Sequence, residues 1–390
     1  MEKAVIVEGA RTPIGKFLGS FADTPAVELG TLAFREAMRR ADVPPEQIDQ
    51  TIVGHARQAG NGPNTGRQVS VRSGVPIEVS AYNVNIACGS GMKAVQLAAQ
   101  LIALGDAEVV LAGGMENMTR VPYLLPDMRR GHRLGDTQIV DAMYRDGLLD
   151  PLCGLVMGET AENLVDRYGI SREEQDEFAL ASQSKAAAGA SRRAEELFPV
   201  EAALAGRPIT VADDEHPRPD TTLEALAKLK PVFRDGGSVT AGNSSGITDG
   251  AAAMVVMSEA RAKAEGREPL ARIVAWSWAG VRPELMGIGP VPATAKALDR
   301  TGLTIADFDV IEMNEAFAAQ VIACERELKF DRDRLNPNGG GISLGHPIGM
   351  SGARIILALA YELRAAGKSL GLATLCISGG QGLAVVLERA

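Results

Sequence analysis

The chain has 390 residues, of which 46% are hydrophobic, 23% charged and only 4% aromatic, as in an ordinary folded protein with a core of aliphatic and small side chains. Forty basic and 49 acidic residues leave a net charge of −9, which excludes a protein devoted to nucleic acid. No apolar run reaches the roughly 18 to 20 residues of a membrane span, no signal peptide is recognisable, and four scattered cysteines fit neither a disulfide framework nor a zinc site, so we expect a cytoplasmic protein without bound metal.

An internal duplication organises the chain. Each copy opens with an apolar strand, continues through an amphipathic helix, a turn and a second strand, and then has a glycine-rich turn before another helix and strand. The matching segments, in chain order, are residues 4–7 with 271–275, 32–49 with 294–309, 88–104 with 346–363, and 108–112 with 371–376. Strands that alternate with helices favour sheets covered by helices on both faces. The sequence therefore predicts an α/β fold built from two similar halves.

A long insertion interrupts the first copy. The last strand of the second copy, residues 380–387, follows its predecessor at once, whereas its counterpart at 250–257 comes only after a charged stretch rich in proline. This stretch carries predicted helices such as 172–188. We predict three parts: an N-terminal half formed by 1–120 plus 249–269, an inserted loop domain at 121–248, and a C-terminal half at 270–390. A functional site is expected between the halves.

Cys88 is the first candidate for chemistry. It lies in the run Asn-Ile-Ala-Cys-Gly-Ser-Gly-Met, residues 85–92, between a predicted strand and a predicted helix. A thiol at a helix N-terminus faces unpaired N–H donors and the positive end of the helix dipole, which predicts a lowered pKa and a larger thiolate fraction. The alternative is a small residue that fills the core.

His346 occupies the place of Cys88 in the second copy. If the halves pack about a pseudo-two-fold axis, the two helix N-termini converge and bring an imidazole to a thiol, which is the minimum for covalent catalysis. A loop histidine with satisfied hydrogen bonds is the alternative. The remaining histidines are expected to be surface or structural residues: His55, His132 and His216.

Two further candidates end strands of the second copy. Cys376 is followed by Ser378 and two glycines, a turn whose successive N–H groups could form an anion-binding nest. This cysteine could fill the core, act as a redox partner of Cys88, or serve as a general acid and base. Asn314 follows the buried strand at 310–313 and is either a turn residue or a neutral amide that orients a water or a carbonyl.

Taken together, these segments resemble the thiolase family, from Arg11 to the C-terminus. The blocks that carry the resemblance are Asn-x-x-Cys-Gly-Ser-Gly at 85–91, Gly-Gly-Met-Glu-Asn-Met at 113–118, Asn-Glu-Ala-Phe at 314–317, Gly-His-Pro at 345–347, and Cys-x-x-Gly-Gly at 376–380. The resemblance implies a five-layered αβαβα fold with a loop domain inserted in the N-terminal half. It also implies an acyltransferase that uses acyl-CoA substrates, with coenzyme A as substrate or product and no other cofactor.

The resemblance also implies a role for each matching residue. Cys88 would be the nucleophile, His346 its base, and Cys376 the acid and base for the second substrate. Asn314 would hold a water in an oxyanion hole beside His346, and the backbone N–H groups of Cys88 and Ser378 would hold the acyl oxyanion. The implied CoA contacts are Leu148, Met157, Arg218, Ser245, Gly246, Ala316 and Phe317. Arg218 is the implied partner for the nucleotide end.

The sequence departs from the family pattern at two positions. Val156 precedes Met157 where acetoacetyl-CoA thiolases commonly place a histidine, which leaves room for a longer acyl chain. Ser378 stands where glycine is usual, but its backbone N–H is retained.

The leading hypothesis is a thiolase that catalyses reversible Claisen condensation of acetyl-CoA. The alternative is a 3-ketoacyl-CoA thiolase of broader chain length in fatty-acid β-oxidation. A decarboxylating ketoacyl synthase is disfavoured by Cys376, and a non-catalytic CoA-ester or lipid carrier by the intact Cys88, His346 and Cys376. A thiol–disulfide switch between the two cysteines lacks a C-x-x-C pair. The resemblance further implies a homo-oligomer, either a dimer or a tetramer, with no nucleic-acid or membrane partner.

Overall fold

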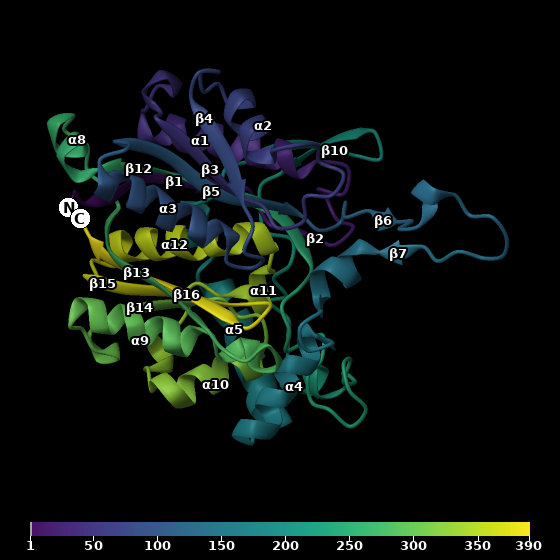
Figure 1. The fold of residues 1–390 in the computed structure, drawn as a ribbon. Coiled ribbons are helices and arrows are strands. Elements are labelled where there is room, and N and C mark those ends of the chain that lie inside the picture. The colour runs from purple at the N-terminus through teal and green to yellow at the C-terminus, as the bar shows by residue number, and fades with distance from the viewer. Residues whose placement is uncertain (1) are drawn as a thin grey trace.

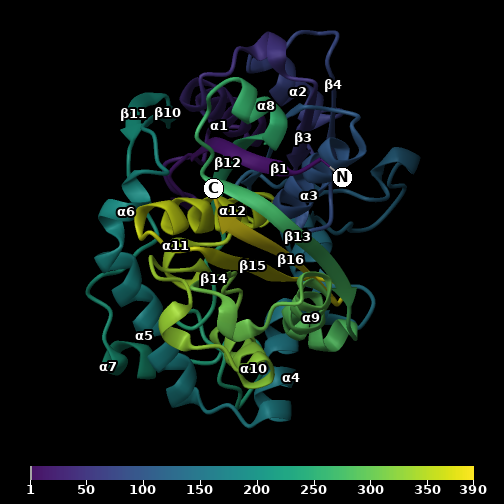
Figure 2. The same cartoon turned by 90° about the vertical axis from the view of Figure 1, so that its left-hand side faces the viewer.

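A computed structural model describes residues 2–390 of the chain. Its elements form five layers in the order α/β/α/β/α, with a central pair of helices and one sheet layer on each side of them (Figure 1). The same layers are seen from the side in Figure 2. The predicted fold class, two duplicated α/β halves with an insertion in the first, is confirmed.

The N-terminal half contains strands in the order β4-β3-β5-β12-β1. Their bounds are β4 (Ser80–Val84), β3 (Gln50–Gly54), β5 (Val109–Asn117), β12 (Thr248–Ser258) and β1 (Ala4–Arg11), and the short β2 (Gly15–Lys16) pairs with the start of β12. Helices α1 (Ala26–Ala41) and α2 (Thr65–Arg72) cover the outer face, and α3 (Ser90–Leu104) covers the inner face. Helix α1 packs an apolar stripe that includes Leu29, Ala33 and Phe34 against the sheet.

The C-terminal half repeats this order as β14-β15-β16-β13. The bounds are β14 (Val310–Met313), β15 (Leu370–Ile377), β16 (Gln381–Arg389) and β13 (Ala271–Gly280); α8 (Glu259–Ala264) precedes β13. Helices α9 (Pro290–Thr301) and α10 (Ala318–Leu328) lie on the outer side, and α12 (Ile348–Ala365) lies on the inner side. Within residues 2–390, we find no helix with the length and apolar character that crossing a bilayer requires.

In both halves, an aspartate before one strand accepts two backbone N–H groups at the start of a neighbouring strand. The carboxylate of Asp49 accepts the N–H groups of Glu108 and Val109, at 2.8 and 2.9 Å. In the second half, Asp309 accepts from Ser369 and Leu370 in the same way, at 2.8 and 3.1 Å. The strands that follow Asp49 and Asp309, β3 and β14, are therefore structurally equivalent. The two sheets meet where β1 and β13 pair antiparallel over three residues of each strand.

Glycines allow the two central helices to touch at their first turns. A Cβ atom at Gly91 of α3 would lie 2.8 Å from the backbone nitrogen of Ala353 and the oxygen of Gly349, both on α12. At Gly352 of α12, it would lie 2.4 Å from the backbone nitrogen of Met92. Any side chain at these positions would push the helices apart. The N-termini of α3 and α12 therefore lie side by side in the middle layer.

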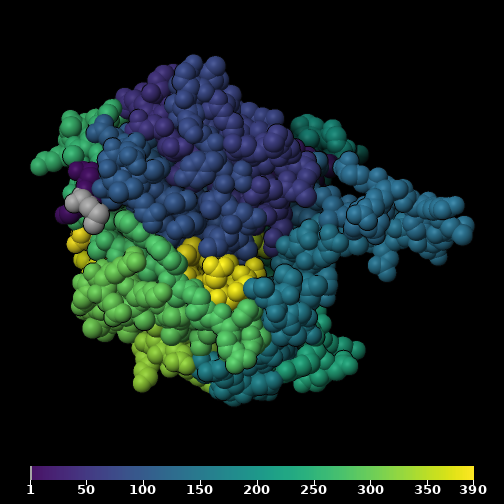
Figure 3. Space-filling model, in the orientation of Figure 1, coloured from purple at the N-terminus to yellow at the C-terminus, as the bar shows by residue number. Residues whose placement is uncertain are grey.

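The segment between β5 and β12 forms the insertion. Its elements are β6 (Tyr123–Leu124), β7 (Val140–Asp141), β8 (Leu149–Asp150), β9 (Leu155–Val156), α4 (Met157–Tyr168), α5 (Arg172–Ala188), α6 (Ala190–Ala194), β10 (Val200–Leu204), β11 (Arg207–Val211) and α7 (Leu223–Ala227). The arm formed by β6, β7 and their connection projects away from the body (Figure 3). We propose that the inserted loop domain begins at residue 121, that the N-terminal half resumes at residue 249, and that the C-terminal half begins at residue 270.

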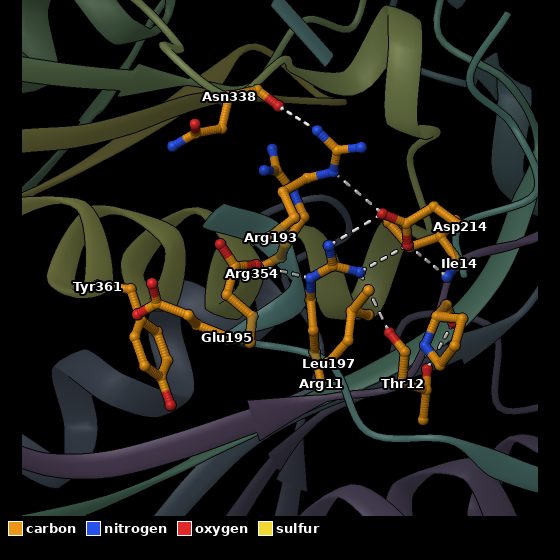
Figure 4. A network of polar contacts seen from close by, with 12 residues as sticks. Arg11, Thr12, Ile14, Arg193, Glu195, Leu197, Asp214, Asn338, Arg354 and Tyr361 are labelled. Carbon is orange, nitrogen blue, oxygen red and sulfur yellow. Dashed lines mark hydrogen bonds and ion pairs between the residues drawn. The ribbon is translucent and has the colours of Figure 1, made fainter. Parts of the chain in front are cut away.

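A buried network of charges ties the insertion to both halves (Figure 4). Arg11 of β1 donates from Nε to Glu196 at 2.7 Å and from Nη1 and Nη2 to Asp214 at 2.7 and 3.0 Å. Arg193 also contacts Asp214, at 3.4 Å, and donates to the carbonyl of Asn338 in the C-terminal half at 3.0 Å. Because Asn338 lies in the segment that leads to His346, this network fixes one side of the candidate site.

Candidate active site

Cys88 and His346 stand at equivalent places in the two halves. Each lies two residues before a central helix, since α3 begins at Ser90 and α12 begins at Ile348. The turn before Cys88 is strained, because Ala87 has a φ of 45°. The side chain of Asn85 accepts the N–H of Ala87 at 2.9 Å and thus holds this turn. The predicted convergence of the two helix N-termini is confirmed.

Cys88 is half-buried and forms no disulfide with the other cysteines. Removal from water raises its pKa above the ordinary value. The nearby charge of Arg57 and the backbone N–H groups of Ser378 and Cys88 lower the pKa, but they do not outweigh burial. The expectation of a lowered thiol pKa is therefore wrong for the free protein, because the helix terminus is local whereas burial is created by segments from both halves.

Alkylation of Cys88 should reveal this raised pKa. Only the thiolate reacts with iodoacetamide, so the rate is expected to keep climbing through pH 9 instead of levelling off near neutrality. Peptide mass spectrometry at a series of pH values gives the rate for Cys88 separately from the other cysteines. A plateau below pH 8 would contradict the assignment and would mean that the local N–H groups dominate.

His346 is buried and holds a neutral imidazole. Burial, together with the charges of Arg354 and Arg57, lowers its pKa to about 3. Its Nδ1 lies 2.6 Å from the hydroxyl of Ser351, and that hydroxyl donates to the carbonyl of Pro347 at 2.9 Å. Since the hydroxyl proton is used, Nδ1 carries the imidazole proton and Nε2 offers a lone pair. This is the protonation state that a general base requires.

Asn314 lies directly beside this imidazole. Its Nδ2 is 3.5 Å from His346 Nε2, and its Oδ1 is buried without a hydrogen-bond partner among residues 2–390. The residue is fully buried at the end of β14, where its backbone N–H donates to Thr374 at 3.1 Å. A buried amide oxygen without a partner is costly, so it marks a place where a ligand or water can donate a hydrogen bond.

Cys376 and the turn after it complete the group. Cys376 is buried in β15, and burial raises the pKa of its thiol well above the ordinary value, with a further rise from the charge of Cys88. Gly379 and Gly380 have φ values of 84° and 77°, which only glycine adopts easily. The turn they make directs the N–H of Ser378 toward the Cys88 sulfur. Loops from both halves thus meet at one sulfur atom.

Asp150, a residue of the insertion, holds this turn in place. Its carboxylate accepts the N–H of Gly379 at 2.9 Å and that of Leu152 at 2.9 Å. The side chain is buried, with 2% of its surface exposed. Asp150 therefore fixes the peptide next to the N–H that faces Cys88. It is a positioning residue, and sequence reasoning alone missed it.

Asp150→Ala is expected to lower kcat about 10-fold, because the turn loses its anchor and the Ser378 N–H moves off the acyl oxygen. Asp150→Asn keeps one carbonyl acceptor and should recover part of this loss. Steady-state kinetics measure both effects, and thermal unfolding monitors the fold. Equal loss in kcat for both variants, with unchanged unfolding temperatures, would show that charge rather than the anchoring bond matters.

The implied CoA contacts fall into four groups. Met157, Ala316 and Phe317 pack in one apolar cluster with Cys376, whereas Leu148 packs in the cluster that contains Cys88. Ser245 and Gly246 lie beside two segments of the site, because the Ser245 N–H donates to the Ala316 carbonyl at 2.9 Å and the Gly246 carbonyl accepts the backbone N–H of His346 at 3.1 Å. Arg218 is exposed near His216, which packs on Gly246. Their contacts with CoA stay predictions.

Three more residues near the nucleophile were not predicted as site residues: Glu116, His55 and Arg57. Glu116 is fully buried and accepts N–H groups from Ala56, Arg57 and Gly349 at 3.0 to 3.2 Å. His55 lies 3.2 Å from Glu116 Oε1, so it is structural, as expected. The duplication offered a signal for Arg57, because it is the eighth residue after Asp49, as Phe317 is after Asp309.

Comparisons with known proteins agree with the geometry. Residues 4–260 match the family model described as thiolase, N-terminal domain, and residues 267–389 match that described as thiolase, C-terminal domain. The chain is 51% identical to an acetyl-CoA acetyltransferase of Escherichia coli, with all of both chains covered. Solved structures with similar folds include a Bacillus anthracis acetyl-CoA acetyltransferase, with 45% identity and a TM-score of 0.97 over 100% of this chain and 99% of that one. Human mitochondrial 3-ketoacyl-CoA thiolase has 42% identity and a TM-score of 0.96 at the same coverage.

Proposed function

Because this chain belongs to the thiolase family, we propose that it is an acetyl-CoA acetyltransferase that works through an acyl-enzyme on Cys88. The observation that carries the proposal is the meeting of two N–H groups, from Cys88 and Ser378, at a thiol whose pseudo-symmetric partner is the neutral His346. Two N–H donors at a carbonyl under attack form an oxyanion hole, which typically stabilises the transition state by about 3 to 4 kcal/mol per donor.

The first step is acyl transfer to the enzyme. His346 Nε2 takes the proton of Cys88, whose sulfur attacks the thioester carbonyl, and the bond between this carbonyl and the CoA sulfur breaks. The leaving CoA thiolate takes its proton from Cys376. The enzyme then holds a Cys376 thiolate and a protonated His346. These opposite charges offset each other, although burial opposes each charge alone.

The second step forms a carbon–carbon bond. The Cys376 thiolate removes a proton from the methyl carbon of a second acetyl-CoA, and the enolate attacks the acyl-enzyme. The Cys88 sulfur leaves and recovers its proton from His346, so no net proton remains on the enzyme. The site beside Asn314 and His346 would stabilise the enolate oxygen, since the Oδ1 of Asn314 and the imidazole of His346 can orient a water. In reverse, the same groups cleave a 3-ketoacyl-CoA.

Acetyl-CoA is expected to leave an acetyl group on Cys88, and Cys376→Ala should retain this acetyl group while losing condensation. The reason is that acylation needs the Cys88 nucleophile and the His346 base, and without Cys376 the leaving CoA thiolate can take its proton from water, whereas the α-proton is removed only by Cys376. Peptide mass spectrometry after rapid quenching locates the adduct. An intact, folded protein that shows no adduct on the Cys88 peptide would overturn the covalent mechanism.

A 3-ketoacyl-CoA thiolase of broader chain length is a second candidate. Val156, an apolar residue, caps α4 directly before Met157, which packs with Cys376. The likeness to human mitochondrial 3-ketoacyl-CoA thiolase also supports it. Thiolysis rates measured against chain length distinguish the candidates, because reaction with acetoacetyl-CoA alone would exclude the broader enzyme.

The remaining parts of the proposal concern the setting of the enzyme. We propose that acyl-CoA is its only ligand class, that Arg218 contacts the nucleotide end, and that no metal is needed because side chains handle each proton. We also propose a cytoplasmic homo-oligomer, a dimer or a tetramer, that acts in fatty-acid metabolism. The projecting arm supports self-association, since Leu134 and Ile139 on it are 92% and 66% exposed.

A further inference from the structure

The block Gly-Gly-Met-Glu-Asn-Met at 113–118 has no role in the proposed reaction. Most of it forms the C-terminal end of β5, a fully buried strand in the sheet that packs on α3 and α12 (Figure 1). A Cβ atom at Gly349 of α12 would lie 2.3 Å from the carbonyl oxygen of Met115, and one at Gly114 would lie 2.1 Å from the carbonyl oxygen of Gly349. The end of β5 therefore touches the N-terminus of α12, the helix that follows His346.

The carboxylate of Glu116 in this block binds the segment that carries His346. Its Oε2 accepts the N–H of Gly349, the second residue of α12, at 3.0 Å. Only Pro347 and Ile348 separate Gly349 from His346, and the proline ring restricts φ at its position. The placement of the imidazole therefore depends on where Glu116 holds Gly349.

The same carboxylate oxygen binds the segment that carries the nucleophile. Glu116 Oε2 accepts the N–H of Ala56 at 3.2 Å, and the carbonyl of Ala56 accepts the Nδ2 of Asn85 at 3.0 Å. The Oδ1 of Asn85 accepts the N–H of Ala87 at 2.9 Å, and Cys88 is the next residue. An unbroken series of hydrogen bonds therefore runs from the start of α12, through Glu116, to the turn before Cys88.

The other oxygen of Glu116 holds the side chain in place. Oε1 accepts the N–H of Arg57 at 3.1 Å and lies 3.2 Å from His55 Nε2, and the whole residue is buried. Burial is the main cause of the raised pKa of the Cys88 thiol, and the negative charge of Glu116 adds to it. Because this charge disfavours the thiolate, the benefit of Glu116 to the reaction lies in the geometry of its bonds and not in its charge.

We propose that Glu116 is a positioning residue that sets the placement of the Cys88 sulfur relative to the His346 imidazole, because one of its oxygens binds the segments of both. This inference rests on the proposed function. Glu116 acts through Gly349 and Asn85 and not on a reacting atom. A base must lie within hydrogen-bond reach of the proton it removes, and a shift of about 1 Å can lower a rate on the order of 10²-fold.

The test compares two reactions of the same sulfur in Glu116→Gln. The amide keeps the shape and one acceptor, but its NH₂ group faces an N–H donor, so one link of the series opens. Single-turnover acylation of Cys88 by acetyl-CoA is expected to fall about 10- to 100-fold. Alkylation by iodoacetamide at pH 8 depends on the thiolate fraction and not on the placement of His346. It should not fall, because removal of the negative charge lowers the thiol pKa.

Further variants locate the effect in this series of bonds. Glu116→Asp keeps both acceptors on a shorter side chain and should recover part of the acylation rate. Asn85→Ala breaks the same series nearer to Cys88, so adding it to Glu116→Gln should cost little more than the slower single variant. Asp49→Asn is the matched control, because Asp49 also accepts two backbone N–H groups, at 2.8 and 2.9 Å, but at the opposite end of β5. Its acylation rate should stay within about twofold of the wild type.

Each outcome bears on one claim. Acylation that is unchanged in Glu116→Gln, or that falls together with alkylation, would overturn the inference, and so would additive effects of the two substitutions. Alkylation of the fully buried Cys324 would reveal an unfolded variant, and Glu116→Asp would then carry the same comparison of the two reactions. None of these results affects the acetyl adduct on Cys88 of the wild type, so the proposed function would stand. Absence of that adduct in the folded wild type would refute the proposed function itself.

Discussion

Replacing Cys88 by alanine is expected to lower kcat by a factor on the order of 10⁴ or more. The acyl group then has no atom to which it can bind, and Cys376, although close by, is buried with a pKa raised well above the ordinary value. Direct attack by water or by a second substrate must replace a two-step route. Condensation and thiolysis rates, measured separately, should fall together because both pass through the same acyl-enzyme.

A matched control is available on the same side of the molecule. Cys153 lies in the insertion, next to Leu152, and is also a partly exposed free thiol. Cys153→Ala is expected to leave kcat within about twofold, since no step of the reaction uses this thiol. If Cys88→Ala retains more than one tenth of wild-type activity while it is correctly folded, the nucleophile has been misassigned.

Replacing His346 by alanine is expected to slow acylation of Cys88 by about 10²- to 10⁴-fold at neutral pH. The thiol pKa is raised, so without a base almost no thiolate forms near pH 7. In the wild type, the pKa of His346 is lowered to about 3, so the imidazole is already neutral above that pH. The acylation rate of the wild type should therefore show no inflection near pH 6.5, the ordinary histidine value.

The sign of the pH effect distinguishes a base from a structural residue. In His346→Ala, acylation should rise steeply with pH, because hydroxide replaces the base and the thiolate fraction grows toward the raised pKa. Rapid-quench measurement of the Cys88 adduct between pH 5.5 and 9.5 tests this. His132→Ala, on the exposed arm, should follow the wild-type profile. A His346→Ala profile that is merely lower, with the wild-type shape, would indicate a structural role only.

The periodicity and the repeats predicted the layout of the fold because the two halves obey the same local rules. The predicted helix at 172–188 coincides with α5, and the predicted strand at 310–313 coincides with β14. Elsewhere the boundaries moved outward: the first strand extends to Arg11, and α1 begins at Ala26. The latter start follows Pro25, a residue suited to helix entry that the repeat comparison did not include.

The sequence by itself determined the duplicated α/β architecture and the equivalence of Cys88 and His346, because strand and helix patterns and glycine turns are local properties that survive duplication. Only the tertiary structure decided the electrostatic state of the site. The upward shift of the Cys88 pKa, the neutral His346, the Asp150 anchor and the unpaired Nε of Arg57 all arise from segments far apart in the chain. Burial and charge act through space, so a residue's neighbours along the chain do not fix its protonation or its missing partner.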